Sequence, residues 1–116
     1  LKADRATIAL PEPGEPLLVP QGLRFASGTP VETWDAYAQG LIEVQDLGSQ
    51  LIVEALPVAP GDTIIDLCAG AGGKTLALAA RLGNAASLIA ADTDKRRLGN
   101  LAPRAARAGA AIDHTL

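Results

Sequence analysis

A glycine-rich run in the middle of the chain restricts the fold more than any other feature. Residues 63–75 read TIIDLCAGAGGKT, and the apolar part, residues 64–67, is too short for a helix. A short apolar run beside glycines is typical of a buried strand, and glycine lets the backbone turn sharply without a Cβ clash. Residues 74–82 are almost wholly apolar, and Gly83 follows them as a helix stop. The run therefore predicts a central strand, a tight turn and a helix.

The chain after Gly83 continues this alternation. We expect a buried strand at 87–91, a helix at 94–108 with a kink or break near 99–102 caused by Pro103, and the start of a third strand at 111–116. Buried strands that alternate with helices pair in parallel. The predicted fold class is α/β, the first half of a Rossmann-like sheet, which binds ligands at the carboxyl ends of its strands. In the last helix we expect Leu98, Leu101, Ala102 and Ala105 to face inward, and Arg96, Arg97, Arg104 and Arg107 to face mostly outward.

The first forty residues differ in composition from the rest. Five of the eight prolines lie at positions 11, 13, 16, 20 and 30, and proline removes a backbone donor and disfavours helix just before it. We expect turns and short strands around 17–19 and 23–26. The sequence thus predicts a lead-in segment at 1–39, the tail of an N-terminal subdomain, and the N-terminal half of a Rossmann-like domain at 40–116.

A short strand at 41–44 and a helix are expected between the lead-in segment and the glycine-rich run. Asp46 is the predicted N-cap, because its carboxylate can accept from free amides two or three residues further on. Pro57 and Pro60 end the helix. One helical stripe contains the apolar residues Leu47, Leu51, Ile52 and Ala55.

Composition and charge limit the classes of function. A chain of 116 residues that is 48% hydrophobic forms one domain with a core, and its net charge of −3 argues weakly against a strong nucleic-acid footprint. One cysteine excludes an internal disulfide and fits a reducing compartment. No apolar run approaches the roughly 20 residues that span a bilayer, and charges at Lys2, Asp4 and Arg5 argue against a signal peptide. We expect a monomeric cytoplasmic protein without a membrane partner.

The turn and the helix after it form a predicted site for an anionic ligand group, because free amides and the positive helix end point there. Asp92 lies 22 residues after Gly70, near the spacing at which an acid meets ribose hydroxyls in nucleotide-binding units. A phosphate loop requires glycine where Cys68 stands, and a dinucleotide fingerprint requires glycine or alanine where Thr75 stands. S-adenosylmethionine fits better, since its carboxylate suits Lys74 and the helix start, and its ribose suits Asp92.

The same residues also allow a purely structural interpretation. A glycine cluster before a helix often serves only as a tight strand-to-helix turn. Asp92 could cap the next helix, as could Thr93 or Asp94, and Asp66 could be a hydrogen-bonded polar residue at a strand end.

Three runs, at 40–50, 66–75 and 91–98, closely resemble the Sun/Fmu (RsmB-type) RNA cytosine-5 methyltransferases. The resemblance extends over roughly residues 40–110, in order and with similar spacing. The opening residues 1–5, LKADR, also resemble the segment ahead of the catalytic core in that family. The loop departs from the usual form, because Gly70 and Ala71 stand where alanine and proline are common.

The resemblance implies a Rossmann-like methyltransferase sheet with S-adenosyl-L-methionine as cofactor and RNA, above all ribosomal RNA, as partner. It implies a helix beside the site with Gln45, Asp46 and Ser49. The cofactor-binding residues that it implies are Cys68, Ala69, Gly70, Ala71, Gly72, Gly73, Lys74 and Asp92. Cys68 belongs to this loop, and we expect it to be a small packed side chain rather than a nucleophile.

In the family, a cysteine thiolate attacks C6 of cytosine so that C5 can accept the methyl group. Two cysteines on later loops serve this chemistry, and the chain ends before both. We therefore expect a truncated piece of the enzyme, with no catalytic residue and no metal ligand, that is inactive alone. The alternatives are a fragment of a nicotinamide-dinucleotide-binding oxidoreductase and a non-enzymatic RNA-binding module. Trp34 and Tyr37 are expected to be packing residues, and His114 to be exposed.

Overall fold

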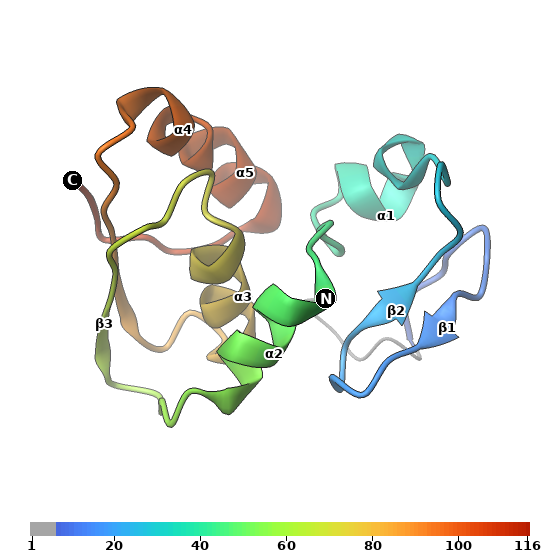
Figure 1. Cartoon of the computed structure of the whole chain (residues 1–116), viewed down its shortest axis with the longest axis horizontal. Helices are drawn as coiled ribbons and strands as arrows, with labels where there is room; N and C mark the ends of the chain where they lie inside the picture. Colours follow the sequence, from blue (N-terminus) through green and yellow to red (C-terminus); the bar gives the residue numbers. More distant parts are fainter. Residues whose placement is uncertain (1–6) are drawn as a thin grey trace.

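The computed structural model describes residues 7–116, so that the resemblance of residues 1–5 lies outside the described residues. In chain order the elements are β1 (Glu15–Pro16), β2 (Leu23–Arg24), the 3-10 helix η1 (Val31–Thr33), α1 (Asp35–Ala38), α2 (Leu47–Ala55), β3 (Thr63–Asp66), α3 (Gly73–Arg81), β4 (Ser87–Ala90), α4 (Lys95–Gly99), α5 (Leu101–Ala108) and β5 (His114–Thr115). Figure 1 shows α2 between the hairpin of β1 and β2 on one side and the larger sheet with its helices on the other.

The larger sheet is parallel, with the strand order β3-β4-β5. Thr63 pairs with Ser87 and Asp66 with Ala90, while Ala90 also pairs with Thr115 of β5. The predicted α/β class with parallel pairing is confirmed. The central position predicted for residues 64–67 is wrong within the described chain, because β4 pairs with both neighbours and leaves β3 at the edge.

Helices cover one face of this sheet. Figure 1 shows α2, α3 and α5 on the same side of β3. Leu88 and Ala90 of β4 are buried beneath them, whereas Ile65 and Leu67 are 55% and 74% exposed. Successive side chains of a strand point to opposite faces, so the exposed pair lies on the face opposite the helices. A complete doubly wound sheet has helices on both faces, and the described residues cover only one of them.

The core beneath the helices has two buried clusters. One contains Ala69, Leu76, Ala90, Leu101, Ala105 and Ala108, and the other contains Val53, Leu78, Ala79 and Leu88. α2 therefore packs on α3 through Val53, which is 2% exposed, while Ile52 is 53% exposed and Leu51 and Ala55 are exposed as well. The predicted buried stripe on α2 is wrong. The contact with α3, and not the most apolar line of residues, determines which side of α2 is buried.

The predicted break in the last helix is confirmed. α4 ends at Gly99, and α5 begins at Leu101 after Asn100. Pro103 lies in the first turn of α5, where backbone amides make no hydrogen bond within the helix, so its missing amide costs the helix nothing. Asp94 caps α4 by accepting from the amides of Arg96 and Arg97, both at 3.0 Å. Ala102 is exposed and not inward as predicted, since the buried stripe of α5 is Leu101, Ala105 and Ala108.

The lead-in segment has a small core of its own. Trp34 is buried, and the ring of Phe25 meets it edge-on with centroids 5.0 Å apart, which confirms Trp34 as a packing residue. The strand predicted at 23–26 exists as β2, but β1 lies at Glu15–Pro16 and the strand predicted at 17–19 is wrong. The strand predicted at 41–44 is also wrong. Ile42 is buried in one cluster with Trp34 and Ala36. Among residues 7–116, no neighbouring strand pairs with this segment.

Between residues 7 and 116, no helix combines the length and apolar character that crossing a bilayer requires.

Candidate functional site

The turn after β3 is a tight bend made by residues 67–72. Gly70 and Gly72 have φ angles of +54° and +88°, which favour glycine. The amide of Gly72 donates to the carbonyl of Ala69 at 2.8 Å. A Cβ atom on Gly72 would lie 2.1 Å from Cδ1 of Leu101, whereas a Cβ on Gly70 would meet only the mobile end of Arg97. Gly72 is thus required both by its backbone angle and by its packing.

Cys68 lies at the exposed start of the bend. The expectation of a packed side chain is wrong, because the buried member of the turn is Ala69, which joins the core under α5. Cys68 is held through its backbone, where its amide donates to Oδ1 of Asp66 at 3.3 Å.

The carboxylate of Asp92 faces the bend from the end of the neighbouring strand. Its Oδ2 accepts from the amide of Gly70 at 2.7 Å, and its Oδ1 accepts from the amide of Asp94 at 2.8 Å. The bond from Asp94, then that from Gly70, and the nearby charge of Arg97 lower the pKa of Asp92 below 3.8, against a raising contribution from desolvation. Asp92 does not cap α4, because Asp94 does.

We expect Asp92 to titrate below pH 3.8. Since its pKa is lower in the folded than in the unfolded chain, the ionised carboxylate contributes stability above the unfolded value, and this contribution is lost as the pH falls through the folded value. The difference in unfolding free energy between wild type and Asp92→Asn should therefore shrink below pH 3.8. Urea denaturation across this range, with a carbon-detected NMR titration of the carboxyl group, measures both. A carboxyl that titrates above 3.8 contradicts the expectation.

Asp66 and Thr75 tie the end of β3 to the first turn of α3. Thr75 is 1% exposed, and its hydroxyl donates to Oδ2 of Asp66 at 2.8 Å. Asp66 is thus the hydrogen-bonded polar residue at a strand end that the structural interpretation allows. The role of Thr75 is not predicted by the sequence pattern, in which this residue is only a departure from the dinucleotide fingerprint. The available signal was a hydroxyl residue in the first helical turn after a strand that ends in aspartate.

The start of α3 offers free amides beside the bend. Within residues 7–116 the N–H groups of Gly73 and Lys74 donate to no protein acceptor, as expected for the first turn of a helix. The pKa of Asp46 is lowered by its bonds from the amide and hydroxyl of Ser49 and, to a smaller extent, by the charge of Lys74. Asp46 and the start of α2 therefore lie near Lys74, where the resemblance places the signature helix.

Gln45 reaches the same helix start. Its Nε2 is buried without a hydrogen-bond acceptor in the described part of the chain, and it would lie 3.4 Å from a Cβ atom on Gly73. A groove of about 1040 Å³ between the lead-in segment and helices α2 and α3 includes Gln45 and Gly73. Gly70 and Asp92 do not line this groove. The bend and the carboxylate of Asp92 therefore lie outside this groove.

The two arginines of α5 were predicted to face mostly outward, and this prediction is wrong. Arg104 donates through Nη2 to Oε2 of Glu43 at 2.9 Å and through Nη1 to the carbonyl of Ala71 at 2.7 Å. Arg107 donates to Oε1 of Glu43 and lies 3.8 Å from the ring centroid of Tyr37. Glu43 attracts both guanidinium groups, which overrides the outward pattern. No local sequence pattern points to Glu43, because it is 61 residues from Arg104.

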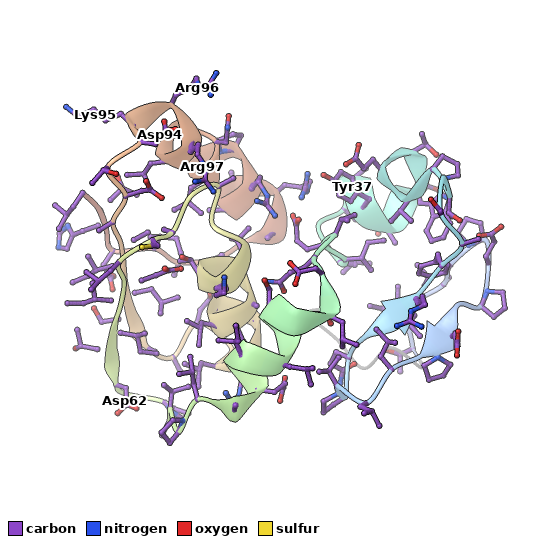
Figure 2. All side chains as sticks on the ribbon, in the orientation of Figure 1. Tyr37, Asp62, Asp94, Lys95, Arg96 and Arg97 are labelled. Atoms are coloured by element: carbon purple, nitrogen blue, oxygen red, sulfur yellow. The ribbon has the colours of Figure 1, made fainter. Side chains whose placement is uncertain are left out.

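The basic residues of α4 remain at the surface. Figure 2 shows Lys95 and Arg96 projecting from the outer end of α4, and Arg97 directed toward the bend. His114 is exposed, as expected. In the described range 7–116, no three His, Cys, Asp or Glu side chains gather as a metal site would require.

The fold and this geometry define a Rossmann-like α/β domain, with a glycine bend at the end of one strand and an acid at the end of the next. Residues 53–115 match the family model described as 16S rRNA methyltransferase RsmB/F. The chain belongs to this RsmB/F family, which confirms the resemblance to the Sun/Fmu enzymes.

Curated relatives and a solved structure agree with this assignment. The chain is 37% identical over 90 residues to the ribosomal RNA small subunit methyltransferase B of Enterobacter sp. (strain 638), covering 78% of this chain and 21% of that protein. It is 38% identical over 92 residues to the 28S rRNA (cytosine-C(5))-methyltransferase of Mus musculus, covering 79% and 20%. The crystal structure of NSun6 from Pyrococcus horikoshii with SFG matches with a TM-score of 0.70 and 30% identity, over 74% of this chain and 23% of that chain. The chain spans about a fifth of the length of these curated relatives.

Proposed function

We propose that this chain forms the cofactor-binding half of an S-adenosyl-L-methionine-dependent methyltransferase that acts on C5 of cytosine in RNA, above all ribosomal RNA. The observation that carries the proposal is the hydrogen bond from the amide of Gly70 to the carboxylate of Asp92. It brings an ionised acid to the glycine bend across two parallel strands. The names of the relatives support the reaction, since one is an rRNA cytosine-C(5)-methyltransferase. The bound SFG of the solved relative, an S-adenosylmethionine analogue, supports the cofactor.

The residues of the site fit the cofactor. The free amides of Gly73 and Lys74 and the positive end of α3 suit its methionyl carboxylate. Asp92 suits the ribose hydroxyls, because each of its oxygens accepts one backbone bond and keeps a further lone pair. When bound, S-adenosylmethionine supplies an electrophilic methyl group. The proposed cofactor-binding residues are Cys68, Ala69, Gly70, Ala71, Gly72, Gly73, Lys74 and Asp92.

The division of the chain remains part of the proposal. Residues 1–39 would be the lead-in segment, and residues 40–116 the N-terminal half of the Rossmann-like domain. The cysteine nucleophile of the reaction would be supplied outside these residues, because Cys68 lies in the cofactor bend. The cytoplasmic location and the monomeric state stay predictions of the sequence.

Titration with S-adenosylhomocysteine tests the cofactor assignment. We expect saturable shifts of the amide NMR signals of Gly70, Gly72 and Lys74, and no saturable response to NAD. Asp92→Ala should weaken the affinity about tenfold or more, as the loss of hydrogen bonds to a charged group implies.

Asp113→Ala is the matched control. The carboxylate of Asp113 also accepts two hydrogen bonds, from Ser87 and from the amide of Leu88, but at the amino end of β4. This variant should lose stability and keep its affinity. Saturable binding of NAD without any response to S-adenosylhomocysteine would overturn the proposal in favour of an oxidoreductase fragment.

A further inference from the structure

A single arginine side chain of α5 reaches the glycine bend. Nη1 of Arg104 donates to the carbonyl of Ala71 at 2.7 Å, and Ala71 is the residue between Gly70 and Gly72. The side chain is 24% exposed, so that the contact is largely shielded from water. Among the described residues no other side chain donates to a carbonyl of residues 70–72.

The bonds from Gly70 to Asp92 and from Gly72 to Ala69 hold the two ends of the bend, but among the described residues no backbone amide donates to the Ala71 carbonyl between them. Gly70, Gly72 and Gly73 have more accessible backbone conformations than any other residue type, and a ligand that requires one conformation must order them on binding. A hydrogen bond from a charged donor to a carbonyl is stronger than one between neutral groups. Holding the Ala71 carbonyl toward α5 fixes the direction of the peptide at the centre of the bend.

Arg104 is itself held in place by Glu43. Its second nitrogen, Nη2, donates to Oε2 of Glu43 at 2.9 Å, so that the planar guanidinium joins a carboxylate to the bend. Arg107 makes the same kind of bond to the other oxygen of Glu43 but contacts Tyr37 instead of the bend. The two arginines therefore share an anchor and similar burial, and they differ in whether they touch the bend.

We propose that Arg104 is a positioning residue of the cofactor site, which uses Glu43 as an anchor to hold the bend at residues 70–72 in its binding conformation. The inference rests on the proposed function insofar as the bend binds the cofactor. Arg104 acts through the backbone of Ala71 and makes no contact with the ligand in this role. A chain without the contact should fold but bind the cofactor more weakly, because ordering the bend then costs part of the binding free energy.

The test compares Arg104→Lys with Arg107→Lys in the full 116-residue chain. A lysine cannot bridge two acceptors with a planar fork, so each variant weakens one bond to Glu43 and only the first also loses the bridge to the bend. We expect the steady-state heteronuclear NOE of the Gly70 and Gly72 amides to fall in Arg104→Lys and to stay unchanged in Arg107→Lys. The affinity for S-adenosylhomocysteine should fall about five- to tenfold in Arg104→Lys and stay within about twofold in Arg107→Lys.

Glu43→Gln provides a second variant if Arg104→Lys does not fold. It keeps Arg104 and removes the charge of its anchor, so that an intermediate loss of bend order and affinity is expected. Equal bend order and equal affinity in the two lysine variants would overturn the assignment of Arg104. If the wild type fails to bind S-adenosylhomocysteine, the proposed function falls, while the NOE comparison still decides whether Arg104 orders the bend.

Discussion

Gly72→Ala is expected to lower the free energy of unfolding by about 2–5 kcal/mol. A left-handed backbone costs an L-residue about 1–2 kcal/mol, and forcing extra volume into a packed core costs about 1–3 kcal/mol more. Both costs apply here, because Gly72 has a φ of +88° and its Cβ would lie 2.1 Å from Leu101. Urea denaturation followed by circular dichroism measures the loss.

Gly61→Ala separates the two causes. Gly61 has a nearly identical φ of +93°, but nothing lies within 4 Å of its would-be Cβ. This variant should lose only the backbone part, about 1–2 kcal/mol. Equal losses in the two variants would show that Leu101 yields freely, and would contradict the tight packing of the bend against α5.

Gly40→Ala is expected to have an effect of similar size, about 2–5 kcal/mol. Gly40 has a φ of +71°, and its Cβ would lie 1.9 Å from the backbone carbonyl oxygen of Arg107. A backbone atom cannot move aside as a side chain can, so either the end of α5 or the chain around Gly40 must shift. The fluorescence of Trp34, the single tryptophan, reports the lead-in segment, while circular dichroism reports the helices.

The control for Gly40 is Gly28→Ala. Gly28 has a φ of +83° and open space where the Cβ would lie, so the expected loss is again about 1–2 kcal/mol. If Gly40→Ala costs no more than Gly28→Ala, the backbone at Gly40 or at the end of α5 shifts freely, which would contradict the tight contact between Gly40 and Arg107.

The parts of the fold that depend on neighbouring residues were predictable from the sequence. The strand, bend and helix at 63–82 follow from a short apolar run, three glycines and an apolar helix, all within one stretch of chain. The break before Pro103 and the cap at Asp46 are equally local. The position of Asp92 opposite the bend was also predictable, because parallel strands bring their carboxyl ends to one edge.

The features that the sequence did not reveal depend on contacts between distant parts of the chain. Glu43 binds arginines 61 and 64 residues away, so no local pattern distinguishes Arg104 and Arg107 from solvent-facing charges. Val53 is the buried residue of α2 because it faces α3, although Leu51 and Ile52 are equally apolar. The segment at 41–44 has the composition of a strand, but composition does not supply a partner strand.

The open face of the sheet has a consequence for the bend. Ile65 and Leu67 lie on that face, and Leu67 directly precedes Cys68. Burying an aliphatic side chain of this size contributes about 1.5–3 kcal/mol, so any element that covers the two residues also stiffens the strand from which the bend departs. Under the proposed function, the coupling between coverage of this outer face and cofactor affinity at the bend is reciprocal: each favours the other by the same amount.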